Sequence, residues 1–600
     1  MRKSLALFLI LIAVLFSYAP SLRNGFVWDD TALVLRDPLI RSWRLIPEGF
    51  NHFLFVDASA SNFYRPLQRL TYTFDYAAFA LRPFAYHLTS VLCHAAAAVA
   101  FFFLAEELLL LFAIESAKRR TIAFMATLAW AIHPVHSGAV AYISGRADPL
   151  AALFGFIGLY LVLRSLRGDG RRTLLFLSVA TIAFLLSALS RESGLLMPVL
   201  AMALLALHRK SRALAGTAIV GIFSTVVYLS LRLPAEHVSP PVLRPPAPFY
   251  VRPILAARAV AEYTGLIALP LSLHMERDIE TRPGRFTPTS LTAAAWRELQ
   301  TLLGLLLIAA FVYWMVRARK RNPAVFDCLA LAVLSYLPVS GLFPLNASAA
   351  EHWIYVPSAF LFLGATVQIA GLARTGMGRS TIAATAVLAS LWMLFLGVRT
   401  FVRGFDWRDQ RTFLERTIAH GGASARMLIN LGELELSEGK LPEAASHLHA
   451  ALEKQPDQPF ALIDLAAVAL KQNDFKLARQ LLTRATSMPA VEARAHELLA
   501  VLEFKENKRI DLLRLRLASR TGASNWSIER RYVQALDQTG ATDRAIAELK
   551  VCLATEWYRA ETWQLLGQLL SKAGRPGEAA EALARARAYD AHLGEQPAPL

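Results

Sequence analysis

The sequence predicts an all-α protein: a polytopic bundle of about eleven membrane-spanning helices followed by a C-terminal solenoid of paired helices. Apolar residues make up 55% of the 600 residues and the mean hydropathy is +0.39, values too apolar for a water-soluble chain. Long apolar runs alternate with short basic loops, and a repeat of about 34 residues follows the last run. A chain of this length also exceeds what one hydrophobic core can serve, so at least two domains are expected.

The first apolar run follows Met1, Arg2 and Lys3 and continues to about Ala19. It has the form of a signal peptide, but the many runs behind it favour an uncleaved membrane anchor. Further runs that can cross a hydrocarbon core of about 30 Å lie near 86–112, 121–141, 149–166, 173–189, 194–207, 213–231, 299–316, 324–342, 353–372 and 380–399.

Clusters of Lys and Arg predict the orientation, because such clusters remain on the cytoplasmic side during insertion. They occur in every second loop, at Arg2–Lys3, 118–120, 164–172, 208–212, 317–321 and 374–379. The N-terminus is therefore expected inside, and the loops at about 20–85 and 232–298, together with everything beyond 400, on the opposite face. The segment 256–273 is apolar enough for a twelfth span, but Glu262 and Pro270 favour a re-entrant or interfacial helix.

These basic loops account for most of the formal charge of +17, so no nucleic-acid partner is expected. The three cysteines, Cys93, Cys328 and Cys552, are scattered along the chain and predict neither a disulfide framework nor a metal cluster.

The repeat that begins at Ala425 has the pattern of a tetratricopeptide repeat (TPR), which is a helix–turn–helix unit. In the first unit the pattern positions are Leu428, Leu431, Gly432, Ala444, Leu448, Ala451 and Pro456. A second clear unit begins at Pro459 and a last one at Ala560, with degenerate units near 493 and 526. We predict a transmembrane domain at 1–404, a linker at 405–424, about five repeats at 425–593 and a tail at 594–600. The concave surface of such a solenoid can bind a peptide, although a rigid spacer or a dimerisation element would have the same pattern.

Two adjacent carboxylates, Asp29 and Asp30, follow the first span by about ten residues. Charge so close to a membrane is costly unless it has a use, and a carboxylate there can deprotonate or orient a hydroxyl. The alternative is that one of them caps a helix or is simply solvated.

Other polar residues fall in the loops assigned to the same face of the membrane. They are Arg65, His133, His136, Arg146, Asp148, Arg191, Glu192, Glu351 and His352. An arginine matches phosphate oxygens through its planar donor fork, and a histidine or carboxylate can act on a hydroxyl proton.

Several of these residues have simpler interpretations. His133 and His136 could bind a metal, cap or pack a helix, or contact substrate, and no third ligand has a clear spacing. Arg146 with Asp148 could form a structural ion pair, as could Arg191 with Glu192. A divalent metal is therefore not indicated, and no P-loop, dinucleotide-binding glycine pattern, HExxH or GxSxG motif is visible.

Taken together, the motifs resemble those of the transmembrane and TPR-containing (TMTC) protein O-mannosyltransferases and their bacterial relatives, members of the GT-C glycosyltransferases. The resemblance runs through almost the whole chain, in the order NGFVWDD, FYRPLQRLTYTFDY, FAYHLTSVLCH, AIHPVHSGAVAYISGRADPLAALF, LSRESGLLMP, PLSLHMERDIE, LFPLNASAAEHWIYVPS and then the TPRs. This ordered set is far more specific than any one motif.

The resemblance implies an inverting transfer of a sugar, most often mannose, from a polyprenyl- or dolichyl-phosphate carrier to a Ser or Thr hydroxyl. It implies Asp29 or Asp30 as the catalytic carboxylate. The lipid-linked sugar is the expected donor; no cofactor is certain, and the sequence leaves a metal requirement open. Arg65, Arg146, Arg191 and His352 are the candidates for holding phosphate. For sugar, acceptor or support, the candidates are His133, His136, Asp148, Glu192 and Glu351.

The chain departs from its relatives at Trp353, where an arginine often stands, and at Arg191, where a lysine is frequent. The first change weakens the expected phosphate contact there, and the second keeps the charge. Two alternatives stay open: the same chemistry on a lipid or cell-envelope glycan, and a non-catalytic membrane-anchored TPR scaffold. The expected partners are the lipid-linked donor, membrane lipids and an acceptor protein in the TPR groove. The expected location is a bacterial inner membrane, or the endoplasmic reticulum in a eukaryote.

Overall fold

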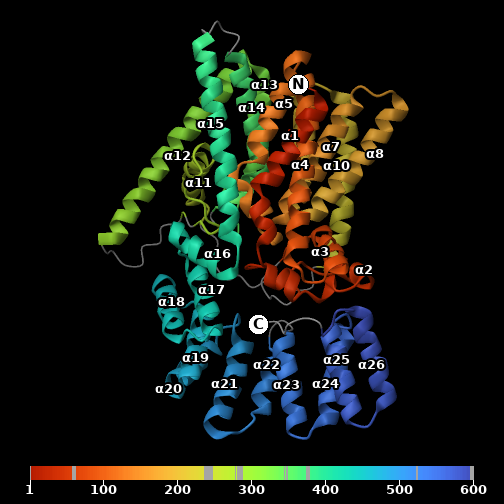
Figure 1. Ribbon diagram of the computed structural model, residues 1–600, viewed down its shortest axis with the longest axis vertical. Coiled ribbons are helices and arrows are strands. Elements are labelled where there is room, and N and C mark those ends of the chain that lie inside the picture. The colour runs from red at the N-terminus through yellow and green to blue at the C-terminus, as the bar shows by residue number, and fades with distance from the viewer. Residues whose placement is uncertain are drawn as a thin grey trace. The chain divides into compact units, whose positions relative to one another are not determined.

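The computed structural model describes residues 2–56, 62–235, 248–277, 279, 288–343, 345, 347, 349–372, 379–521 and 525–594. These parts are almost entirely helical, and their only β-type pairing is an isolated bridge between Arg277 and Ala349. Two compact units result (Figure 1). The membrane unit comprises Met1–Val27, Pro83–Leu233 and Pro245–Gly422, and the repeat unit comprises Trp28–Arg82, Pro234–Arg244 and Ala423–Leu600. Residues 236–247, 278 and 280–287 of the predicted 232–298 loop, and the predicted tail beyond 594, lie outside the described residues.

The helices of the membrane unit are α1 (Lys3–Ser17), α4 (Pro83–Leu111), α5 (Ser116–Ala131), α6 (Ser137–Val140), α7 (Ala147–Ser165), α8 (Gly170–Ser190), α9 (Leu196–Leu207), α10 (Ser211–Arg232), α11 (Arg252–Ala268), α12 (Pro288–Arg321), α13 (Pro323–Tyr336), α14 (Tyr355–Leu372), α15 (Arg379–Gly404) and α16 (Gln410–Thr417). Seven helical segments in the described residues are long and apolar enough to cross a membrane. They are Pro83–Leu111, Ile143–Ser165, Gly170–Ser190, Ser211–Ala235, Ala295–Arg321, Glu351–Gly371 and Ala383–Trp407. Shorter apolar helices occupy three more predicted spans, at Lys3–Ser17, Glu192–Leu207 and Pro323–Val339. The chain is therefore a multi-helix membrane protein.

The predicted span at 121–141 is not one continuous helix. Helix α5 ends at Ala131, and a 3₁₀ turn, η5 (Pro134–His136), leads into the short α6. Pro134 has no N–H to donate, and it holds the preceding His133 in an extended conformation (ψ 126°), so the helix cannot continue through this point.

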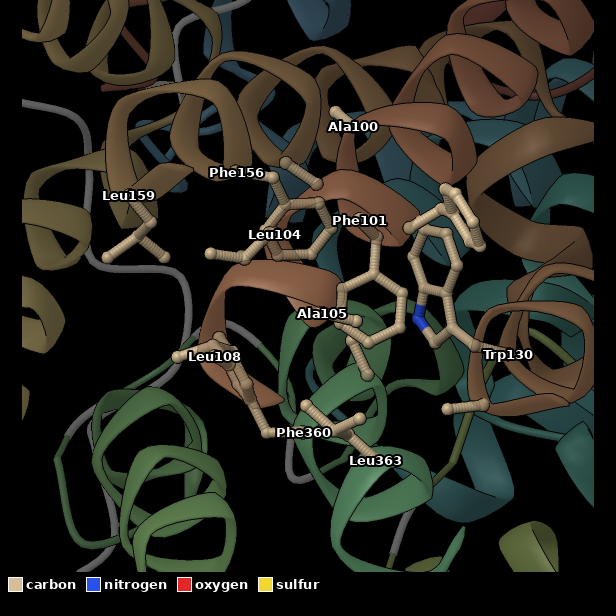
Figure 2. Close-up of a cluster of buried hydrophobic side chains, with 14 of the residues drawn as sticks. Ala100, Phe101, Leu104, Ala105, Leu108, Trp130, Phe156, Leu159, Phe360 and Leu363 are labelled. Atoms are coloured by element: carbon tan, nitrogen blue, oxygen red, sulfur yellow. The ribbon is translucent and has the colours of Figure 1, made fainter. Parts of the chain in front are cut away.

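The core of the membrane unit is formed where α4, α5, α7 and α14 meet (Figure 2). Phe101 lies 5.3 Å from Phe156 and 5.5 Å from Trp130, measured between ring centroids. The indole N–H of Trp130 donates to the carbonyl of Tyr355 over 2.8 Å, so its one polar atom is satisfied inside the apolar core. This packing fixes the ends of the helices that carry the candidate motifs.

The helices of the repeat unit are α2 (Ile46–Phe50), α3 (Pro66–Phe79), α17 (Ala425–Ser437), α18 (Leu441–Lys454), α19 (Pro459–Gln472), α20 (Phe475–Ala485), α21 (Glu492–Asn507), α22 (Leu512–Arg520), α23 (Trp526–Gln538), α24 (Thr542–Thr555), α25 (Ala560–Lys572) and α26 (Pro576–Tyr589). From α17 onward they form consecutive antiparallel pairs. A Cβ at Gly432 would lie 2.8 Å from Leu448 Cγ, which explains why the pattern demands glycine there. Lys471 donates to the carbonyl of Leu436 in the preceding repeat, and Lys505 makes the equivalent contact one repeat later.

Candidate active site

The two candidate catalytic carboxylates lie on a turn at the start of the repeat unit. Trp28 has a left-handed backbone (φ +52°), and the carbonyl of Asp29 accepts from the backbone N–H groups of Ala32 and Leu33. Asp30 is completely buried and directly precedes the π-helical turn η2 (Thr31–Leu35). Its side chain makes no capping hydrogen bond to that turn, so the capping alternative does not describe it.

Arg65 and Arg69, one helical turn apart, have different surroundings. Arg65 is half-buried at the N-cap of α3, with its guanidinium carbon 4.3 Å from the centroid of Phe63. Arg69 is 2% exposed and uses all five of its N–H donors. It pairs with Asp37 over 3.0 Å and donates to the carbonyls of Gly49, His52, Phe53 and Leu54. Arg69 therefore organises the Trp28–Arg82 segment.

Within the membrane unit, Asp148 pairs with Arg191. Asp148 lies in the first turn of α7, and Arg191 links α8 to the 3₁₀ turn η7 (Glu192–Leu195). A Cβ at Gly194 would lie 2.3 Å from the carbonyl carbon of Ser187, so only glycine permits this close return of the chain. The ISGRAD and SRESG motifs thus meet through an ion pair.

Arg146 is completely buried at the end of another 3₁₀ turn, η6 (Ile143–Arg146). Its Nε donates to Ser90 Oγ over 3.0 Å and its Nη2 to the carbonyl of Tyr86 over 2.5 Å. Both partners lie on α4, where His87 Nε2 also donates to the carbonyl of Gly25 over 3.2 Å. The guanidinium of Arg146 is therefore held near the N-terminal end of α4.

The two histidines of the HPVH motif lie in the packed interior. His133 Nδ1 accepts from the N–H of Val135, and its Nε2 lies 3.1 Å from the carbonyl of Ile267. Both ring nitrogens are used, as expected of a neutral histidine that caps a turn. His136 is also fully buried, with its ring centroid 4.8 Å from that of Tyr355 and its Nε2 3.5 Å from Ser358 Oγ. Among the residues that the structure describes, no group of three His, Cys, Asp or Glu side chains could hold a metal ion.

Glu351 is the centre of a buried charge network. Its Oε1 accepts from the N–H of His274 over 2.6 Å and from Arg277 Nη2 over 2.9 Å. Its Oε2 lies 3.8 Å from Arg403 Nη2, and Arg277 also pairs with Glu262. Side chains of Glu351, Arg277 and Arg403 are at most 3% exposed.

Acidic and basic side chains alternate in this network, so each buried charge lies next to a charge of opposite sign. Arg403 pairs with Asp406 over 2.8 Å as well as facing the carboxylate of Glu351. Burial and the adjacent Arg277 lower the pKa of His274 to about 3, so this histidine is neutral at physiological pH. A buried, paired charge network of this kind fixes the entry to α14.

Glu192 and His352 are half-buried and lie in the 3₁₀ turns η7 and η10 (Glu351–Ile354). Arg146 lies at the end of η6, so the predicted motifs around Arg146, Glu192 and His352 share one local structure. In each, a short 3₁₀ turn leads directly into an apolar helix.

Sequence reasoning did not single out Arg69, Arg277 or Arg403 as site residues. Arg277 stands inside the quoted PLSLHMERDIE motif, and Arg69 stands inside FYRPLQRLTYTFDY. Arg403 closes the last apolar run, where a buried charge is expensive and so signals a partner. Those signals were present, but the partners come from distant segments.

The fold and these residues define a multi-pass membrane protein with a C-terminal TPR solenoid. A tetratricopeptide-repeat family model matches residues 435–502, which confirms that this part of the chain contains TPRs.

Curated relatives resemble the chain well beyond the repeats. It is 24% identical over 459 residues to protein O-mannosyl-transferase F38B6.6 of Caenorhabditis elegans, covering 75% of this chain and 62% of that protein. It is 23% identical over 518 residues to protein O-mannosyl-transferase TMTC3 of Homo sapiens, covering 80% of this chain and 54% of that protein. The predicted resemblance to the TMTC proteins is confirmed, and the chain spans little more than half the length of these relatives.

Among solved structures, ArnT from Cupriavidus metallidurans bound to undecaprenyl phosphate is 14% identical, with a TM-score of 0.36. The match covers 84% of this chain and 81% of that chain.

Proposed function

We propose that this protein is an inverting membrane glycosyltransferase. It transfers a sugar, mannose as the first candidate, from a polyprenyl- or dolichyl-phosphate carrier to Ser or Thr hydroxyls of extracytoplasmic proteins. The observation that carries the proposal is the Asp29–Asp30 turn, where the carboxylate of Asp30 is completely buried. The activity printed in the names of the curated relatives agrees with it.

In the proposed reaction Asp29 or Asp30 accepts the proton of the acceptor hydroxyl as its oxygen attacks the anomeric carbon. The bond from that carbon to the carrier phosphate breaks, and the lipid phosphate leaves with the bonding electron pair. A phosphate needs little protonation to leave, so one carboxylate suffices, unlike the two that glycoside hydrolases use. Arg65, Arg146, Arg191 and His352 are the proposed ligands of the carrier phosphate.

The charge pattern supports an orientation for this chemistry. The N-terminus lies in the cytoplasm, and the Asp29–Asp30 turn and the TPRs lie on the other side, where a flipped sugar carrier is exposed. In a cysteine-free background, a membrane-impermeant thiol reagent should label Ser437→Cys in intact cells and should not label Ser211→Cys. The reverse labelling would put the repeats in the cytosol and remove the acceptor from the proposal.

Sugar transfer itself can be tested with purified full-length protein, polyprenyl-phosphate mannose and an acceptor protein. Loss of the catalytic base should lower transfer by about 10²–10⁴-fold in Asp29→Asn or Asp30→Asn. Glu48→Gln is the matched control, since Glu48 lies in the same segment and pairs with His52. Full activity in both aspartate variants would refute the assignment. Label recovered in lipid instead of protein would identify a glycolipid acceptor.

A further inference from the structure

The Trp28–Arg82 segment, which carries the two aspartates, packs against the last TPR of the same unit. Leu39 and Leu45 form a buried apolar cluster with Tyr558, and the ring of His52 lies 5.3 Å from that of Tyr558. Ser42 Oγ donates to the carbonyl of Ala588 over 3.2 Å. The segment therefore covers apolar surface of this repeat, as a neighbouring element does in a solenoid.

A continuous chain of polar contacts leads from the last helix toward the aspartates. Asp590, the C-cap of α26, accepts from the hydroxyl of Tyr76 over 2.7 Å. The guanidinium carbon of Arg41 lies 4.6 Å from the ring centroid of Tyr76. Burial raises the pKa of Asp590, and the Tyr76 hydroxyl and Arg41 oppose that rise, so the three groups interact directly.

Arg41 completes the connection to the turn. Its Nη2 donates to the carbonyls of Val34, over 3.1 Å, and Leu35, over 2.5 Å. These carbonyls belong to η2, the π-helical turn that begins immediately after Asp30. An isolated π-helical turn is rarely stable by itself, so external donors to its last carbonyls matter for its geometry.

The other side of the turn touches the first repeat. The guanidinium carbon of Arg426, in the first turn of α17, lies 5.4 Å from the ring centroid of Trp28. Trp28 immediately precedes Asp29 and carries the left-handed backbone of the turn. The carboxylate turn is thus held from both ends of the TPR array. Arg426 of the first repeat contacts it directly, and Asp590 of the last repeat reaches it through Tyr76 and Arg41.

We propose that Arg41, Tyr76 and Asp590 are positioning residues, through which the last TPR sets the orientation of the Asp29–Asp30 turn. The inference rests on the proposed function in that these aspartates act on the acceptor hydroxyl. It gives the TPR array a second role besides acceptor binding: the array completes the loop that performs the chemistry. Deletion of the repeats would therefore disturb catalysis as well as acceptor binding.

The test uses full-length protein in nanodiscs and hydrogen exchange at the backbone amides of residues 31–36. Tyr76→Phe removes only the hydroxyl, and Asp590→Ala removes its acceptor. Both variants should exchange about tenfold faster in this stretch, because a lost buried hydrogen bond to a charged group frees the turn to open. Glu581→Gln is the matched control, because Glu581 lies on the same helix, is exposed and pairs with the nearby Arg585.

Transfer kinetics provide the second readout. In the same two variants kcat should fall as the exchange rate at 31–36 rises, because the carboxylate is misplaced. The KM for the acceptor should stay constant, because the groove is intact. Unchanged exchange at 31–36, or a raised KM with unchanged kcat, would overturn the proposal. A wild-type protein that transfers no sugar would instead refute the proposed function, and the exchange result would still show whether the last repeat holds the turn.

Discussion

Replacing Arg69 with methionine tests how the Trp28–Arg82 segment is held together. Asp37 and Arg69 are 1% and 3% exposed at the side chain, and no solvent can replace the lost guanidinium. Breaking a buried ion pair from one side costs about 3–5 kcal/mol, because the other charge is left buried and unpaired. The four backbone carbonyls that Arg69 also binds lose their donors in the same step.

The assay is native-state hydrogen exchange of full-length protein at residues 49–54. A cost of about 3–5 kcal/mol corresponds to exchange faster by roughly 10²–10³-fold or more when local opening limits it. Arg44→Met is the matched control, because Arg44 lies in the same segment but is exposed, and its loss should change exchange by less than about threefold.

A double-mutant cycle sharpens this prediction. Asp37→Asn alone should also destabilise the segment, because Asp37 caps Leu39 as well as pairing with Arg69. The double variant Arg69→Met with Asp37→Asn should cost less than the sum of the two single changes, since only the double variant leaves no lone buried charge. The reasoning would be refuted if Arg69→Met exchanged no faster than Arg44→Met. It would also be refuted if the costs of the two single changes simply added in the double variant.

Three further predictions concern other parts of the chain. Burial and a neighbouring carboxylate raise the pKa of Asp464 to about 8, so its ionised form destabilises the fold increasingly as the pH rises from about 4 to 8. Asp464→Asn should therefore raise the free energy of unfolding at pH 9 by about 2 kcal/mol, which raises the unfolding temperature by about 4–8 °C. At pH 4 the variant and the wild type should unfold at the same temperature. A new Cβ at Gly145 would lie 2.2 Å from a backbone carbonyl of α6, so Gly145→Ala should destabilise the membrane unit by about 1–3 kcal/mol in thermal unfolding. Gly265→Ala, which meets no atom within 4 Å, is its control, and equal unfolding temperatures would contradict the prediction. Arg191→Met should cost about 3 kcal/mol, and adding Asp148→Asn should recover part of it; an absence of coupling would argue against the ion pair.

Several features followed from the sequence because they depend on local patterns. The TPR phase is set by small and apolar residues at fixed spacing, and α17 begins at Ala425 as that phase requires. Each apolar run was long enough to require burial or lipid contact, whichever neighbours it later acquired. Pro134 even marks where the predicted 121–141 span is interrupted, although its hydropathy alone suggested a continuous helix.

The pairing of charged side chains was decided only by tertiary structure. Proximity in sequence suggested pairs within each motif, whereas the fold brings Asp148 to Arg191, more than forty residues away, and Arg146 to Ser90. A buried charge takes the partner that packing brings within reach, and that partner can be distant in the chain.

The same reason explains the Asp29–Asp30 turn. The sequence by itself determined that two carboxylates follow the first span, and that a TPR solenoid follows the apolar runs. Only tertiary structure decided that the segment bearing those carboxylates caps the last repeat, through Tyr76 and Asp590. These residues stand more than five hundred positions apart, and no local periodicity encodes a contact that forms only when both ends of the chain are folded.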